Sequence, residues 1–187
     1  MRLLILLTAV AGCMPDISAT LDAGPCPEGA EEVVADVSTT VVVTDSGLEV
    51  PITIAQLVVD ATDYDNWVYI DLSVPEENSS LWQLAFKRFE VELGSNVDAA
   101  ILDGVPIEEA YIPDDGWQVD LPDADDDGKP ERVFDEWYDY DYETHTLTPK
   151  PLTYIVRDPE AAYAVAFEAY YDDAGTSGVV SLRLRVL

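Results

Sequence analysis

His145 is the only histidine in the 187-residue sequence, and it lies in the stretch DYDYETHTLTPK at 139–150. An imidazole can hold a metal ion or haem iron through a ring nitrogen, or move a proton in catalysis. It can also be a packed or half-exposed side chain on a β-strand, which is the more frequent situation. His145 is therefore a candidate iron ligand, and its surroundings must decide between these roles.

A run of acidic residues at 123–131, DADDDGKPE, has the composition of a cation-binding loop. Ca²⁺ takes about 6 to 8 oxygen ligands, and Gly128 permits a sharp turn around the ion. An EF-hand needs a glutamate where this sequence has Phe134, so the loop is more similar to those of FG-GAP and thrombospondin type 3 repeats. The expected calcium ligands are the side chains of Asp123, Asp125, Asp127 and Glu131 and the backbone carbonyl of Lys129. The alternative is a solvated acidic turn.

The remaining reactive side chains do not indicate catalysis. The sequence has no G-x-S-x-G nucleophile motif, and its two cysteines, Cys13 and Cys26, lie far from His145 along the chain. These three residues do not have the spacing of a zinc site. Carboxylates are so numerous that no acid/base pair stands out. We therefore expect a binding protein rather than an enzyme.

The first residues, MRLLILLTAVAGC, have the pattern of a bacterial lipoprotein signal. The apolar run from Leu3 to Val10 is too short to span a bilayer, which takes about 20 apolar residues. Small residues then precede Cys13, whose thiol would carry the lipid after cleavage. We expect residues 1–12 to be the signal and the mature chain to be anchored to the membrane through Cys13. A plain secretory signal, cut a few residues away, is the alternative.

Residues 13–31 mix proline, glycine, aspartate and small residues without an apolar period, which predicts a flexible tether. If Cys13 is lipidated, Cys26 is left without an intramolecular disulfide partner. If it is not, a bridge between the two becomes possible. In either case the segment from 32 to 187 is long enough to bury a core without disulfides.

The formal charge is −29, from 38 acidic and 9 basic residues. Such a field repels nucleic acid and favours cations and basic partners, so nucleic-acid binding is excluded. The chain is nevertheless 48% hydrophobic and 10% aromatic, which is too high for a disordered acidic chain. These values predict a folded domain with an acidic surface.

The sequence predicts that the elements which position His145 and the acidic loop are mostly β-strands. In the last segment, 179–187, leucine and valine alternate with arginine, the period of a half-buried strand. The expected strands are 33–43, 48–59, 67–74, 86–93, 132–140, 152–157 and 179–187. Segment 160–171, EAAYAVAFEAYY, fits either an alanine-rich helix or a strand, and the turn residues that follow favour a strand. We expect one all-β domain over 32–187.

Four blocks in this domain follow one another in a recognisable order. They are DATDYDNWVYIDLSV (60–74), LWQLAFKRFEVELGS (81–95), WYDYDYETHTLTPKPLTYIVR (137–157) and AYAVAFEAYYDDAGTSGVVSLRLRV (162–186). Their tryptophan, tyrosine and T-H-x-L-T-P-K motifs resemble those of the HmuY family of bacterial haem-binding lipoproteins. The resemblance covers roughly 58–187, and Gln83 stands where the family commonly has aspartate.

The resemblance implies an all-β fold shaped like a hand, which grips haem between projecting β-elements. It also implies an outer-membrane lipoprotein, on the periplasmic or cell-surface face, that passes haem or another tetrapyrrole to an outer-membrane transporter. Family members hold the iron with two histidines or with methionines. This domain contains one histidine and no methionine, so it cannot supply a two-histidine site from one chain. The iron donors that stay open are His145, Met14 and Cys26 of the tether, and the ten tyrosines.

Two functions therefore stay open from the sequence. The first is haem capture and delivery, with aromatic side chains stacked on the porphyrin. The second is a surface-exposed binding module of the same fold, stabilised by calcium and without haem ligation. The aromatic residues of the blocks fit both, because aromatic side chains in strands mostly fill cores. These residues are Trp67, Tyr69, Trp82, Phe86, Trp137 and Tyr138.

Overall fold

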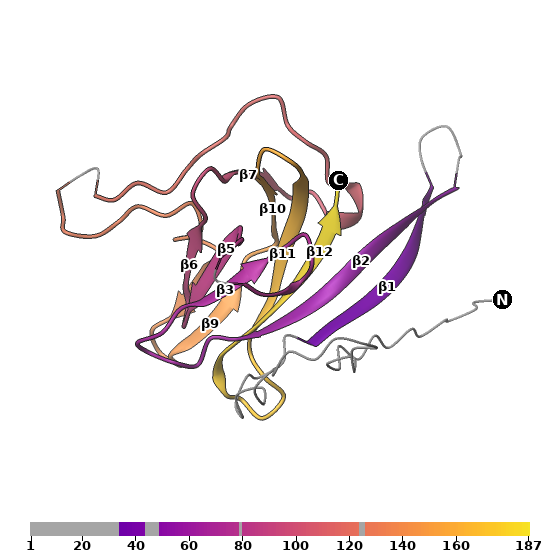
Figure 1. Cartoon of the computed structure of the whole chain (residues 1–187). Helices are drawn as coiled ribbons and strands as arrows, with labels where there is room; N and C mark the ends of the chain where they lie inside the picture. The colour runs from indigo at the N-terminus through magenta and orange to yellow at the C-terminus, as the bar shows by residue number, and fades with distance from the viewer. Residues whose placement is uncertain (1–33, 44–48, 79, 124–125) are drawn as a thin grey trace, which may run out of the picture.

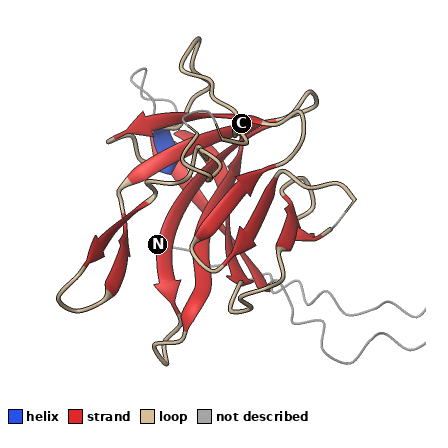
Figure 2. Ribbon diagram, turned by 90° about the vertical axis from the view of Figure 1, so that its left-hand side faces the viewer, coloured by secondary structure: helices blue, strands red, loops and turns tan. Residues whose placement is uncertain are grey.

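The computed structural model describes residues 34–43, 49–78, 80–123 and 126–187, and its regular secondary structure is almost entirely antiparallel strands, joined by loops and turns (Figures 1 and 2). The expected all-β fold is thus confirmed. The lipoprotein signal, Cys13, Cys26 and the expected tether lie outside the described residues. No helix in the described ranges is long and apolar enough to cross a membrane.

The large sheet has six strands in the order β1-β2-β12-β11-β10-β7. The long hairpin of β1 and β2 forms one edge and reaches away from the rest of the molecule (Figure 1). Their bounds are β1 Val34–Val43, β2 Glu49–Asp60, β7 Asp98–Asp103, β10 Leu152–Arg157, β11 Ala162–Tyr171 and β12 Ser177–Val186. A single 3₁₀ turn, η1 Ile107–Glu109, is the one helical element in the described part of the chain (Figure 2).

Two smaller sheets complete the fold. The second sheet has the order β4-β3-β5-β6, and the third is the hairpin β8-β9. Their bounds are β3 Val68–Asp71, β4 Glu76–Glu77, β5 Leu84–Lys87, β6 Glu90–Leu93, β8 Tyr138–Asp141 and β9 Thr146–Pro149. Buried side chains of all three sheets meet in one apolar cluster, with Phe86, Trp137 and Phe167 among its members.

The last strand forms as its sequence predicts. Leu182 and Leu184 of β12 are buried, and the alternating Arg183 and Arg185 are half-buried on the other face. The burial ends before Val186, which is 63% exposed. Segment 160–171 also forms a strand, β11, and the helical alternative is wrong. Its consecutive residues Ala162–Val165 are all buried, so both faces of the strand are packed there.

The stretch 86–93, expected as one strand, is a hairpin of β5 and β6 that turns at Arg88 and Phe89. Arg88 has a φ of 57°, a left-handed conformation that costs about 1 to 2 kcal/mol for a residue with a side chain. Its guanidinium offsets this by donating to the carbonyls of Thr62 and Ser177, both at 2.9 Å. A methyl group added at Gly178 would lie 2.7 Å from Arg88 Nη1, so glycine is needed beside this turn.

The stretch 132–140 was also expected as one strand, but only its end belongs to β8. Residues before it form tight turns, because the Asp135 carboxylate accepts from the Arg132 amide at 2.9 Å. A further turn bond joins the Trp137 amide to the Phe134 carbonyl at 3.2 Å. This arrangement buries both Phe134 and Trp137, which an extended strand would have pointed in different directions.

Candidate ligand-binding site

The β8-β9 hairpin stands on a buried aromatic base. Trp137 is fully buried, stacks on Phe167 of β11 with ring centroids 4.5 Å apart, and donates its indole N–H to the Phe89 carbonyl at 2.9 Å. On β9, Leu147 is buried, and its amide donates to the Tyr171 hydroxyl at 3.1 Å. The hairpin is therefore fixed to the core at its base, while its outer side chains remain exposed.

A hollow of about 720 Å³ opens between this hairpin, the β5-β6 turn and the end of β11. We call it the tyrosine hollow. The aromatic residues in its lining are Phe89, Tyr138, Tyr140, Tyr142, Tyr170 and Tyr171. Its polar lining includes His145, Lys150 and three carboxylates, those of Asp135, Glu136 and Asp139. Small-molecule sites commonly combine aromatic walls with a few convergent polar groups; this lining has nearly as many polar groups as rings, and its volume lies within the usual range of about 300 to 1,000 Å³.

His145 lies in the lining of this hollow, in the turn that precedes β9 rather than on a strand. Its φ of 56° is left-handed. Its Nδ1 atom lies 2.9 Å from the Tyr140 hydroxyl, and both side chains are exposed. The structure thus brings the predicted iron-ligand candidate together with a phenol, which is a second kind of haem-iron donor.

The tyrosines of the hollow differ in burial. Burial raises the pKa of Tyr170, whose side chain packs edge-on against Trp137. Burial also raises the pKa of Tyr138, and the nearby Asp135 carboxylate adds to the effect. Both groups are held as neutral phenols, so they contribute surface for stacking rather than an anionic donor.

Lys150 provides a positive charge at this hollow. Its Nζ lies 3.9 Å from a carboxylate oxygen of Glu136 and 3.9 Å from one of Asp139. Both carboxylates are well exposed, so these are weak pairs that a ligand carboxylate can replace. Lys150 is a residue that the sequence did not single out, although it stands in the T-H-x-L-T-P-K motif.

The aromatic residues that the sequence did single out divide between core and surface. Trp137 and Phe86 are fully buried in the core cluster, and Tyr138 alone of the six lines the tyrosine hollow. Trp67 lies under the Lys87 ammonium, 4.7 Å from the ring centroid, and Tyr69 packs on Trp82 at 5.0 Å. The other tyrosines of the hollow could have been found from the repeated tyrosines at 138–142 and 170–171.

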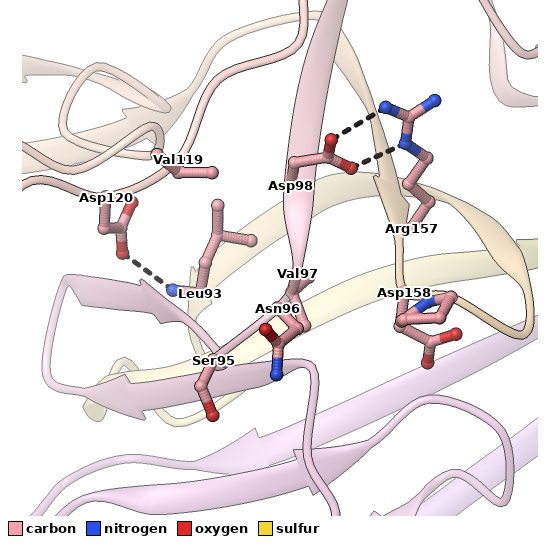
Figure 3. Close-up of a pocket in the computed structure, with 11 residues that line it drawn as sticks. Leu93, Ser95, Asn96, Val97, Asp98, Val119, Asp120, Arg157 and Asp158 are labelled. Carbon is pink, nitrogen blue, oxygen red and sulfur yellow. Dashed lines mark hydrogen bonds and ion pairs between the residues drawn. The ribbon is translucent and has the colours of Figure 1, made fainter.

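A second hollow, of about 760 Å³, lies near the start of β7 and the end of β10 (Figure 3). We call it the aspartate hollow. Asp98 and Arg157 form a two-bond ion pair across it, at 2.7 and 2.8 Å, and the guanidinium lies 3.5 Å from the Trp117 ring centroid. Asp120 accepts hydrogen bonds from the Leu93 amide at 2.7 Å and the Val133 amide at 2.9 Å.

The charges of the aspartate hollow are therefore already paired within the protein. Asp158 likewise accepts from the Gln83 side chain at 2.8 Å and the Glu160 amide at 2.8 Å. Burial raises the pKa of Asp120, and its two amide hydrogen bonds oppose that effect without reversing it. The carboxylates of the aspartate hollow therefore hold loops against the sheets and are not left available to a ligand.

The acidic loop is closed at its base by a bridge between Leu121 and Glu131. Within it, the Gly128 amide donates to Asp123 at 3.1 Å and the Lys129 amide to Asp127 at 2.8 Å. Asp125 lies outside the described residues. Among the described residues, no group of three or more histidine, cysteine, aspartate or glutamate side chains is placed to hold a metal ion. The calcium ligand set stays a prediction.

No protein-family model matches the chain, and no curated protein matches its sequence. Solved structures do match. The apo form of the HmuY analogue of Tannerella forsythia is 14% identical with a TM-score of 0.56, over 70% of this chain and 94% of the other. A candidate HmuY-like haem-binding protein from Bacteroides vulgatus is 19% identical with a TM-score of 0.54, over 70% and 90%.

A candidate lipoprotein from Bacteroides fragilis is 18% identical with a TM-score of 0.54, over 70% of this chain and 89% of the other. At these identities the likeness shows a shared fold. The resemblance to HmuY-like proteins that the four sequence blocks predict is thus confirmed as a resemblance of fold.

Proposed function

We propose that this chain is a membrane-anchored, HmuY-like lipoprotein that captures haem or a related tetrapyrrole in the tyrosine hollow. The observation that carries the proposal is the lining of that hollow. Six aromatic rings, one imidazole, one ammonium group and three carboxylates line a space of about 720 Å³ beside the β8-β9 hairpin. The shared fold with HmuY-like proteins supports the same assignment.

The chemistry of the hollow matches a flat, iron-containing macrocycle. Aromatic rings offer apolar surface for stacking, as for Phe89 and Tyr138, which already pack on each other with centroids 5.9 Å apart. Tyr140 and His145 offer the oxygen and nitrogen donors that haem iron accepts. Lys150 can pair with one propionate, while the acidic surface repels the second, which should therefore point away from the protein into solvent.

Delivery of the ligand is part of the proposal. A lipid on Cys13 would hold the domain at the outer membrane by the tether 13–31, within reach of an outer-membrane transporter. Stable anchoring takes more than one acyl chain, which a lipidated N-terminal cysteine supplies. Growth of the bacterium on haem as its iron source, compared between wild type and Cys13→Ser, tests whether anchoring matters for delivery.

A haemin titration tests the binding proposal. We expect a sharpened, shifted Soret band that saturates at equimolar haemin, and a weaker complex in His145→Ala. The same titration of Asp114→Ala, an exposed residue outside both hollows, is the matched control and should equal wild type. A Soret shift of wild type that never saturates, or a spectrum equal to that of haemin in buffer without protein, would overturn the proposal.

The second candidate is the calcium-stabilised binding module without haem ligation. The observation that favours it is the loop 123–131 itself, which is closed by a bridge and turns at Gly128 with a φ of 86°. A ligand that binds only the native state raises the melting temperature. Melting with Ca²⁺ and with a chelator therefore decides it, and Asp127→Asn should abolish any rise. Equal melting temperatures would remove calcium from the account.

A further inference from the structure

Five tyrosines line the tyrosine hollow, and each presents a phenol that could meet the iron of a bound haem. They are Tyr138, Tyr140, Tyr142, Tyr170 and Tyr171. A phenol becomes an iron donor only if its oxygen is accessible and its proton has somewhere to go. These two requirements separate the five.

Three of the five fail the first requirement or have a structural task. Tyr170 is only 5% exposed, and Tyr138 is wedged between Phe89 and Trp137. The Tyr171 hydroxyl accepts the amide hydrogen of Leu147, which fixes β9 to β11. Removing any of these from its partners would disturb the base of the hairpin.

Tyr142 is 82% exposed and stands in the turn. Among the described residues, no side chain accepts a hydrogen bond from its hydroxyl. Its ring instead contacts the edge of Tyr140, with centroids 5.0 Å apart. Tyr142 therefore helps to orient the Tyr140 ring, but its own hydroxyl has no side-chain acceptor for its proton among the described residues.

Tyr140 meets both requirements. It is 41% exposed, and its hydroxyl lies 2.9 Å from Nδ1 of His145. Its backbone belongs to β8 and is paired opposite the buried Leu147, so its position is set by the ladder and the core. His145, in contrast, sits in the turn at a left-handed φ of 56°. Sites built on strands hold their geometry better than sites on loops.

On these contacts, and resting on the proposed haem function, we propose that Tyr140 Oη is the protein's donor to ferric haem iron and that His145 assists it. An Fe–O bond forms and the phenol O–H bond breaks. The proton passes to Nδ1 of His145, and no electron is transferred. The opposite assignment puts His145 Nε2 on the iron, with Nδ1–H donating to Tyr140.

This donor makes the site selective for oxidation state. An anionic oxygen matches the charge of ferric iron better than that of ferrous iron, and tyrosinate ligation of haem is an established mode in proteins. The acidic surface adds to this preference, because it favours the more positive metal. The hollow should therefore retain ferric haem and release it when dithionite reduces the iron.

Four variants separate the two assignments, and each is titrated with haemin and with iron-free protoporphyrin. In wild type we expect a phenolate-to-iron charge-transfer band, with phenolate ring modes enhanced in the resonance Raman spectrum. Tyr140→Phe should lose both signatures. His145→Ala should keep them with affinity reduced by about 10- to 100-fold, as for loss of a partner that orients a metal ligand. Tyr142→Phe should keep them, and Tyr111→Phe, 56% exposed and outside the hollow, should equal wild type.

The outcomes distinguish this inference from the proposed function. If wild type binds haemin, and Tyr140→Phe keeps its spectrum while His145→Ala loses it, then the imidazole is the donor and the inference is overturned. If the bands disappear in Tyr142→Phe instead, the inference also fails. Binding of haemin in all these cases leaves the proposed function standing. Melting temperatures near the wild-type value confirm that the exposed substitutions leave the fold intact.

Discussion

The tyrosine hollow and the aspartate hollow have similar volumes, about 720 and 760 Å³, but their side chains are used differently. In the aspartate hollow, Asp98 is paired with Arg157 and Asp120 is bonded to two backbone amides. In the tyrosine hollow, the Tyr140 hydroxyl and His145 Nδ1 are exposed, and within the described ranges their side chains form no hydrogen bond other than the one that joins them. The size of a hollow therefore does not identify a site. What distinguishes a ligand site here is a set of donors that the fold itself does not use.

The comparison predicts that a substitution at the base of the tyrosine hollow lowers both the stability of the fold and the affinity for haemin. Trp137→Ala removes a fully buried indole that packs on Phe167, and such a truncation costs about 3 to 5 kcal/mol of stability. Haemin affinity should fall with it, since two tyrosines of the hollow rest on that ring. Urea denaturation measures the stability change. A loss below about 1 kcal/mol would mean that the base repacks and is not the support described.

A substitution in the aspartate hollow should change the stability of the protein but not its affinity for haemin. Asp120→Ala leaves the amides of Leu93 and Val133 without their acceptor, a change worth about 1 to 3 kcal/mol. Haemin binding should stay at the wild-type level, because Asp120 lies outside the tyrosine hollow. Asp114→Ala is the matched control at an exposed carboxylate and should stay within about 0.5 kcal/mol of wild type. Reduced haemin binding in Asp120→Ala would show that the two hollows are coupled.

The pH dependence of the aspartate hollow has a definite sign. Burial raises the pKa of Asp120 above 3.8, so the folded state binds its proton more tightly than the unfolded state. The stabilisation linked to this carboxyl is fully present below pH 3.8 and is lost as the pH rises through the folded-state pKa. The stability of wild type minus that of Asp120→Asn should therefore fall over this window. Urea denaturation of both proteins across it provides the measurement, and a rising difference would contradict the assignment.

The smallest effect is expected at the rim of the tyrosine hollow. Lys150→Met removes a half-buried ammonium group that we assign to one propionate, and an exposed ion pair contributes about 0.2 to 1 kcal/mol. Haemin affinity should decrease by no more than about fivefold, with the weakest effect at high salt. Isothermal titration at two salt concentrations checks this. An unchanged affinity at low salt would place the propionates elsewhere.

Most of the large sheet could be predicted from the sequence, because alternation and apolar content report burial directly. The β12 strand, in which buried Leu182 and Leu184 alternate with Arg183 and Arg185, is the clearest case. The hairpin at Arg88 could not be predicted, since arginine rarely adopts a positive φ. The carbonyls that accept its stabilising hydrogen bonds belong to Thr62 and Ser177, which are distant in the sequence. Strand β7 was missed, although its residues 98–103 are apolar at the centre.

The candidate site was predictable in part. His145 was identified from its chemistry and lies in the lining of the tyrosine hollow. Its hydrogen bond to Tyr140 depends on the left-handed turn, which brings residues five apart into contact. No sequence motif predicts this turn. The contributions of Phe89 and Tyr170 come from elements that only the folded chain places beside the hairpin. The assignments of Cys13 and of the calcium ligands stay predictions. Direct iron ligation by His145, expected from the sequence, is untested and is the alternative to the proposed Tyr140 donor.

The most direct test of the account is a haemin titration of the purified full chain, in which wild type is compared with the double variant Tyr140→Phe/His145→Ala and with Asp120→Ala. The account predicts a saturable Soret shift in wild type and in Asp120→Ala, and its loss in the double variant despite an unchanged melting temperature. A shift of equal size and affinity in all three proteins, or in none, would contradict the claim that the tyrosine hollow is the ligand site.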